Sequence, residues 1–173
     1  MAGAPGMRRA AELGGRPRAV LAAERDRLRE GGVPGELLLV GGSSLPGALT
    51  RGDVDLHLRV GPADFARTVR RLRRWYAVVH PEIWGPTLAT FAVPAELPTG
   101  LAVTPAGSEH DLRFTRSWQL LAADPGLLAA YNAVKAGYDG SDERAYEQRK
   151  SAFFDELVRR WPGAAVAASP EKW

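Results

Sequence analysis

Two carboxylates, a histidine and an arginine alternate with aliphatic residues along residues 53–60 (DVDLHLRV). Side chains of a β-strand alternate between its two faces, so Asp53, Asp55 and His57 should share one face with Arg59. Paired carboxylates suit Mg²⁺, which combines a few protein oxygens with phosphate oxygens and water. A metal site formed by Asp53 and Asp55 is therefore one interpretation of the strand, although Asp-x-Asp pairs are also common on exposed strand faces.

A turn rich in glycine and serine precedes this strand and favours the metal interpretation. The apolar residues 37–40 read as a buried strand that ends at Gly41, and ten residues separate Gly42 from Asp53. Small residues allow backbone N–H groups and hydroxyls to approach a phosphate closely. We therefore expect Gly42, Ser43 and Ser44 to be able to hold a phosphate beside the carboxylates, with residues 43–50 forming a helical turn.

Helices are predicted on both sides of this strand–turn–strand segment. Residues 17–29 begin with a proline suited to a first turn and are followed by Gly31-Gly32, which should end a helix. Residues 62–75 predict a second helix with apolar residues at i, i+4 and i+7. This second helix also carries five arginines, which we interpret as a solvated basic face in preference to a phosphate-binding one: Arg67, Arg70, Arg71, Arg73 and Arg74.

The remainder of the chain changes from strands to helices. Short strands at 76–79, 87–93 and 101–103 are punctuated by proline and glycine, as expected near the edge of a mixed or antiparallel sheet. Helices are predicted from residue 111 onward, with Asp124 and Ser141 as N-caps. The predicted fold class is therefore α+β, a mixed sheet flanked by helices with a helical C-terminal third.

Composition places the chain among ordinary globular domains. Its 173 residues are enough for one domain, expected over 16–161 between flexible segments at 1–15 and 162–173. The sequence has no cysteine, no long apolar run and no secretory signal, so we expect a cytoplasmic protein without a membrane partner. The net charge of +3 fits a phosphate-bearing ligand, but without a recognisable nucleic-acid module we expect no nucleic-acid partner.

Three ordered motifs resemble the GrpB-like family, and the Gly-Gly-Ser turn with the Asp-x-Asp strand resembles the nucleotidyltransferase superfamily of DNA polymerase beta. The motifs are residues 40–60 (VGGSSLPGALTRGDVDLHLRV), 114–135 (FTRSWQLLAADPGLLAAYNAVK) and 145–157 (AYEQRKSAFFDEL). The resemblance spans residues 36–158 and implies a nucleotidyltransferase-like sheet. The sequence departs from the family at Gly100 and Ala102, where histidines are usual.

The resemblance implies a Mg²⁺-dependent nucleotidyltransferase-like enzyme that uses an NTP, with ATP as the expected donor, and a small-molecule acceptor. Asp53, Asp55 and His57 would be the catalytic residues, and a third carboxylate would come from Glu109 or Asp111. The other residues implied in nucleotide binding supply positive charge or aromatic contacts: Arg51, Tyr131, Lys135, Tyr146 and Lys150.

Two other functions remain open at this point. The missing histidines suggest a non-catalytic module that binds a nucleotide or a CoA-type ligand. The same scaffold could instead perform other chemistry, such as an ATP-dependent ligation in a specialised pathway. Individual residues also have alternatives, because His57 could be a ligand, a substrate contact or an exposed side chain, and Tyr131 and Tyr146 could pack the helices.

Overall fold

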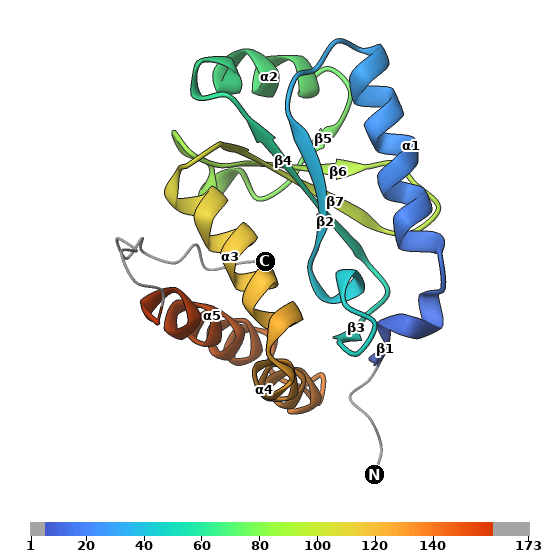
Figure 1. Ribbon diagram of the computed structural model, residues 1–173, viewed down its shortest axis with the longest axis vertical. Coiled ribbons are helices and arrows are strands. Elements are labelled where there is room, and N and C mark those ends of the chain that lie inside the picture. The colour runs from blue at the N-terminus through green and yellow to red at the C-terminus, as the bar shows by residue number, and fades with distance from the viewer. Residues whose placement is uncertain (1–5, 161–173) are drawn as a thin grey trace.

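The alternating segment forms a strand inside a five-stranded mixed sheet (Figure 1). The computed structural model describes residues 6–160 of the chain. Strand β4 (Val54–Val60) pairs antiparallel with β2 (Glu36–Val40) and parallel with β7 (Thr99–Pro105). The sheet continues through β6 (Ala89–Val93) to β5 (Ala77–Val78), giving the order β2-β4-β7-β6-β5. Residues 99–105 therefore form a longer strand than predicted, and it lies inside the sheet rather than near its edge.

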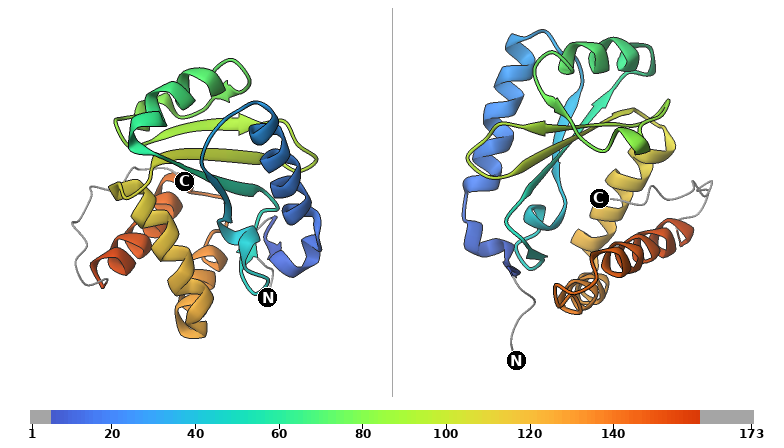
Figure 2. Two further views of the ribbon diagram at one scale, coloured as in Figure 1. Left: turned by 45° about the horizontal axis from the view of Figure 1, so that its top comes forward. Right: turned by 180° about the vertical axis from the view of Figure 1, so that it is seen from behind.

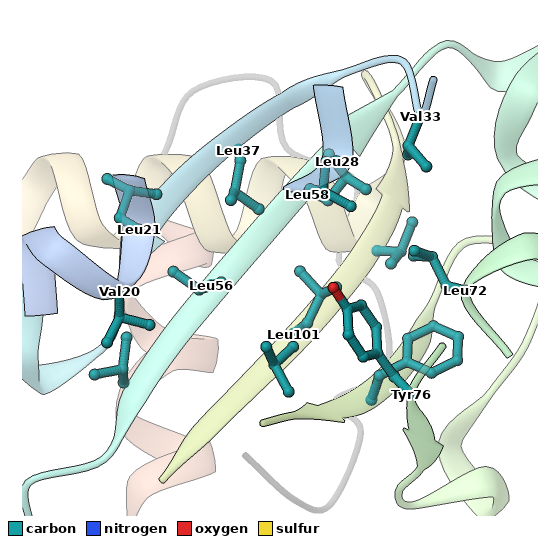
Figure 3. Packing of buried hydrophobic residues seen from close by; sticks show 14 of the residues in the cluster. Val20, Leu21, Leu28, Val33, Leu37, Leu56, Leu58, Leu72, Tyr76 and Leu101 are labelled. Atoms are coloured by element: carbon teal, nitrogen blue, oxygen red, sulfur yellow. The ribbon is translucent and has the colours of Figure 1, made fainter. Parts of the chain in front are cut away.

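The aliphatic face of β4 faces the main hydrophobic core. Helices α1 (Arg16–Glu30) and α2 (Phe65–Leu72) cover this face, with a 3₁₀ helix at Pro62–Asp64 leading into α2. Leu56 and Leu58 of β4 are buried together with Leu101 of β7 (Figure 3). The period of two thus predicted the buried face of this strand correctly.

The C-terminal helices lie on the other side of the sheet (Figure 2). They are α3 (Glu109–Ala123), α4 (Pro125–Ala136) and α5 (Glu143–Arg159), and they enclose a second core around Tyr131 and Leu157. The predicted cap Asp124 is confirmed, because its side chain accepts hydrogen bonds from the first turn of α4. The N-cap of α5 is Asp142 rather than the predicted Ser141, since the Asp142 carboxylate accepts from the backbone N–H of Ala145.

The described part of the N-terminal segment is ordered, which corrects its prediction as flexible. Strand β1 (Arg8–Arg9) pairs with β3 (Leu49–Thr50), and a 3₁₀ helix follows at Ala10–Leu13. Ala10 and Leu13 are buried, so the segment is attached to the domain by apolar contact as well as by pairing. The predicted flexible tail at 162–173 lies outside the described residues, as do residues 1–5.

Further 3₁₀ helices occur at Gly42–Ser44 and Pro81–Ile83. The first of these is the helical turn expected after β2. Within residues 6–160, no helix has the length and apolar character needed to cross a membrane.

Candidate functional site

The turn after β2 is built around Gly41. Gly41 has a φ of 74°, a conformation that L side chains rarely adopt, and a Cβ at this position would overlap the carboxylate of Asp55. Gly42 follows at the start of the 3₁₀ helix and is packed against the carbonyl of Leu49. The two glycines therefore allow the turn to lie directly against Asp55 of β4 and Leu49 of β3.

The two serine hydroxyls hold the turn in place. The Ser43 hydroxyl donates to the backbone carbonyl of Asp53, and the Ser44 hydroxyl donates to the carbonyl of Gly41 at 2.7 Å. Among the residues that the structure describes, the backbone N–H groups of Gly42 and Ser43 have no acceptor. In this arrangement the donors that remain for a phosphate are therefore backbone N–H groups, whereas the serine hydroxyls fix their position.

The carboxylates of Asp53 and Asp55 lie at the start of β4, beside the turn. Asp53 is exposed and Asp55 is half-buried. Desolvation, and then the negative charge of Asp53, raise the pKa of Asp55 to about 7, although Lys135 and Lys150 act in the opposite direction. Across the sheet, Asp55 is paired with Gly100, so no side chain from β7 covers this carboxylate.

Lys135 reaches this position from α4. Its side chain is 7% exposed, and its Nζ would lie 3.4 Å from a Cβ built on Gly42. Burial and the neighbouring Lys150 lower the pKa of Lys135 to about 8, against the opposing influence of Asp53 and Asp55. At pH 7 this ammonium group is still largely protonated, and it lies 5.3 Å from the ring centroid of Tyr131.

Lys150 and Tyr146 reach the same region from α5. The Lys150 ammonium is 2.9 Å from the carboxylate of Glu147 and 5.3 Å from the ring centroid of Tyr146. Burial raises the pKa of Tyr146 to about 12, so its hydroxyl stays protonated near neutral pH. Tyr131 is also buried, and its ring packs against Trp118, Phe153 and Phe154. Tyr131 therefore packs the helices, as the alternative interpretation expected, whereas the ring of Tyr146 contacts the charged groups of Arg51 and Lys150.

Arg51 joins the site from the loop between β3 and β4. Its guanidinium lies 3.3 Å from Glu143, and it stacks over Tyr138 and Tyr146 at 4.7 and 5.2 Å. The Tyr138 hydroxyl donates to the same Glu143 carboxylate at 2.5 Å. Arg51 is therefore held against the start of α5.

His57 does not have the environment that the sequence predicted. Its imidazole is completely buried beneath α3, with Nε2 2.7 Å from the Thr104 hydroxyl and its ring 5.0 Å from that of Phe114. Burial lowers the pKa of His57 to about 4, so the imidazole is neutral at pH 7. The exposed alternative is wrong, and a buried ring cannot contact a substrate in this conformation. His57 is therefore not part of the group formed by Asp53 and Asp55 at the turn.

Neither predicted third carboxylate belongs to the group around Asp55. Asp111 is buried and accepts two hydrogen bonds from Arg59, at 2.5 and 2.9 Å. Arg59 lies near the end of β4, whereas Asp55 lies near its start. It also accepts from the N–H of Gly107 at 2.7 Å. Glu109 is exposed in the first turn of α3. Asp111 is therefore a structural residue that attaches α3 to the sheet.

Asp53 and Asp55 are the carboxylate donors that the turn offers to a metal ion. No group of three or more histidine, cysteine or acidic residues suited to a metal occurs within residues 6–160. Two carboxylates that repel each other nevertheless suit Mg²⁺, which takes most of its remaining ligands from phosphates and water. Asp53 and Asp55 therefore fit a magnesium site in which the substrate phosphates and water supply the remaining ligands, and not a site formed by protein groups alone.

Sequence reasoning missed two acidic residues of the site, Glu143 and Glu147. The spacing of Glu147 and Lys150 by three residues within a predicted helix was a usable signal, because such pairs meet on one helix face. Glu143 had no local signal, since 92 residues separate it from Arg51.

A solved structure shares this architecture. The crystal structure of the conserved protein GrpB from Enterococcus faecalis matches with a TM-score of 0.64 and 12% sequence identity. The match covers 83% of this chain and 93% of that chain. No protein-family model and no curated protein matches the sequence. The likeness shows a GrpB-like fold, and it concerns the fold alone.

Proposed function

We propose that the chain is a Mg²⁺-dependent, nucleotidyltransferase-like enzyme that uses an NTP and modifies a small molecule. One observation carries this proposal: acidic and basic groups from separate parts of the chain meet at the Gly41–Ser44 turn. Asp53 and Asp55 interact electrostatically with Lys135, and Lys135 lies against Gly42. A site with two carboxylates, free backbone N–H groups and partly buried ammonium groups is suited to a metal–triphosphate.

The residues would have distinct roles in this reaction. Asp53 and Asp55 would hold Mg²⁺, which neutralises phosphate charge when it is bound. The N–H groups of Gly42 and Ser43 would donate to phosphate oxygens. Lys135 and Lys150 would compensate the charge of the triphosphate, and Arg51 would do so at the edge of the site.

The overall reaction needs little covalent participation by the protein. A nucleophilic oxygen of the acceptor attacks the α-phosphorus, the bond to the bridging oxygen breaks, and pyrophosphate leaves with the bond electrons. The proton of a hydroxyl acceptor passes to solvent, and a carboxylate or phosphate acceptor has none to lose. Positioning and charge compensation are therefore the main contributions expected from the side chains.

A non-catalytic nucleotide-binding module is a second candidate. It is favoured by the lack of a three-residue metal cluster within the described part of the chain. The phosphate-binding groups would be complete in such a protein, whereas the groups that assist the acceptor would be missing. The two candidates make the same prediction for nucleotide binding and opposite predictions for turnover.

Isothermal titration of ATP, GTP, CTP and UTP, with and without Mg²⁺, tests the proposed binding site. We expect Mg²⁺-dependent binding of at least one NTP that is lost in the Asp53→Asn/Asp55→Asn variant. The matched control is Asp26→Asn/Asp64→Asn, which removes two negative charges from α1 and from the residue preceding α2. Failure of every NTP to bind the native chain, or equal loss of binding in the control, would contradict the proposed site.

Pyrophosphate release separates the two candidates. The protein is incubated with the bound NTP, Mg²⁺ and pools of small alcohols, carboxylates or phosphate esters. Acceptor-dependent pyrophosphate that disappears in Asp55→Asn supports the enzyme. Tight nucleotide binding without pyrophosphate release from any pool supports the binding module instead.

A further inference from the structure

A second charged surface lies away from the candidate site, and we call it the arginine surface. It consists of exposed arginines near the C-terminal end of α1 and along α2 and the turn after it: Arg27, Arg29, Arg67, Arg70, Arg71, Arg73 and Arg74. The five arginines from residues 67–74 confirm the solvated face that the sequence predicted. Their combination with Arg27 and Arg29 is a result of the fold.

Direct contacts join the two parts of this surface. The Arg71 guanidinium donates to the carbonyl of Gly32, just after α1, at 2.9 Å. The ring of Trp75 packs on Gly31, where a Cβ would overlap it. Figures 1 and 2 show α2 and this end of α1 together at one end of the molecule, with α4 at the opposite end.

The arginine surface carries more positive charge than the whole chain. Residues 26–32 and 62–75 contain seven arginines against three acidic residues, Asp26, Glu30 and Asp64, which gives a net charge of +4. The formal charge of the entire chain is +3. Positive charge is therefore concentrated at this end and not spread evenly over the protein.

Ion pairs compensate little of this charge. Arg29 pairs with Asp26 at 2.8 Å and Arg67 pairs with Asp64 at 2.5 Å. Within residues 6–160, the guanidinium groups of Arg70 and Arg74 have no ion pair or hydrogen bond. Like charges spaced by three or four residues on a helix destabilise it. A bound polyanion would remove this repulsion.

The chemistry of the surface suits phosphates. A guanidinium binds a phosphate through two parallel hydrogen bonds, as it does a carboxylate, and it stays charged at any physiological pH. Arg67 and Arg70 lie three residues apart on α2, and Arg74 follows in the turn after this helix. Adjoining parts of one segment therefore carry the three guanidinium groups, so an extended phosphate backbone can contact more than one of them.

An aromatic side chain lies at the edge of the same surface. Trp75 is 37% exposed and follows Arg74 directly, and Arg73 stacks over Trp84 at 6.0 Å. Cationic side chains beside an exposed aromatic ring are the combination that binds single-stranded nucleic acids, because bases stack on the ring.

We propose that the arginine surface binds the phosphate backbone of a single-stranded nucleic acid. The interaction is independent of the proposed nucleotide site, because the two surfaces use different residues. It adds a partner that the sequence did not lead us to expect, since Arg27 and Arg29 are separated in sequence from the arginines of α2.

Fluorescence anisotropy with labelled oligouridine and oligothymidine, each of about 20 nucleotides, tests this inference at several salt concentrations. The native protein should bind one or both oligomers. The Arg70→Glu/Arg74→Glu variant should bind at least about tenfold more weakly. The slope of the logarithm of its binding constant against the logarithm of salt concentration should be smaller in magnitude by about 1.4, or about 0.7 for each lost phosphate contact. Neither side chain has a partner to lose among the described residues 6–160, and circular dichroism checks the fold of the variant.

The matched control is Arg18→Glu/Arg144→Glu, which reverses two exposed charges in the first turns of α1 and α5. Its oligonucleotide affinity should stay within about threefold of the native value, a difference of less than about 1 kcal/mol. An equal loss in the control would show dependence on total charge and overturn the proposal. The proposal would also be overturned if the native protein bound neither oligomer, and binding to phosphatidylserine vesicles would not change that conclusion.

Discussion

Asp55 provides the sharpest test of the site, because the structure predicts that its charge destabilises the fold. Asp55 has a pKa of about 7 in the folded chain, against an ordinary value of 3.8. Between these values the folded state holds a proton that the unfolded state has released. The free energy of unfolding should therefore fall as pH rises from about 4 to about 7, and then remain lower.

The size of the effect follows from the same values. A shift of about three pKa units at about 1.36 kcal/mol per unit gives an upper limit of about 4 kcal/mol. Because Asp55 is only half-buried, water screens part of this penalty, and we expect about 2 kcal/mol. Asparagine has nearly the shape of a protonated aspartate and no charge. Asp55→Asn should therefore leave stability unchanged at about pH 4 and raise it by about 2 kcal/mol at about pH 8.

Urea unfolding followed by tryptophan fluorescence measures this difference. Other titrating groups contribute to both proteins, so the quantity to compare is the difference between the native chain and Asp55→Asn at each pH. The Asp53→Asn variant is the control, since it removes the neighbouring charge and should give a smaller change of the same sign. Parallel stability curves for the native chain and Asp55→Asn across this pH range would refute the argument. A variant that is stabilised but cannot bind a nucleotide would show that these carboxylates are kept for function.

Three further substitutions test other parts of the structure. Gly41→Ala should destabilise the protein by about 1–3 kcal/mol in urea unfolding, because of its positive φ and the overlap with Asp55, and a native-like midpoint would contradict the geometry of the turn. Asp111→Asn should cost about 1–3 kcal/mol, since it weakens buried hydrogen bonds to Arg59 and to the N–H of Gly107 while Arg59 keeps Glu36; thermal unfolding that matches the native chain would show that this pair is not structural. His57→Gln should keep nucleotide affinity within about threefold by calorimetry, a change below about 1 kcal/mol, and a complete loss would return His57 to the site.

Local patterns in the sequence were enough to predict most of the elements. The alternation of residues 53–60 predicted β4 and its buried aliphatic face, because a strand with one face in the core must repeat every two residues. The N-cap at Asp124 was also predicted correctly, since capping depends on a side chain and the N–H groups two or three residues later. At the start of α5 the prediction of Ser141 as N-cap was wrong by one residue, because the Asp142 carboxylate accepts the hydrogen bond from the N–H of Ala145.

Central and edge strands were harder to tell apart. Residues 99–105 carry proline and glycine nearby, which suggested an edge, yet β7 lies between β4 and β6. Pairing partners depend on the path of the whole chain, and a parallel pair such as β4 and β7 has no local turn to reveal it.

The sequence by itself determined which side chains share the polar face of β4, and only the tertiary structure decided what covers each of them. Asp55 lies at the open end near Lys135 and Lys150, whereas His57 and Arg59 are covered by α3 and paired with Thr104 and Asp111. The alternation of a strand fixes the direction of each side chain because it follows from backbone geometry. The partner is fixed by packing between segments far apart in sequence, such as the 52 residues that separate Arg59 from Asp111. The same packing joined the arginines of α1 and α2 into one surface, because the ends of these helices meet only in the folded protein.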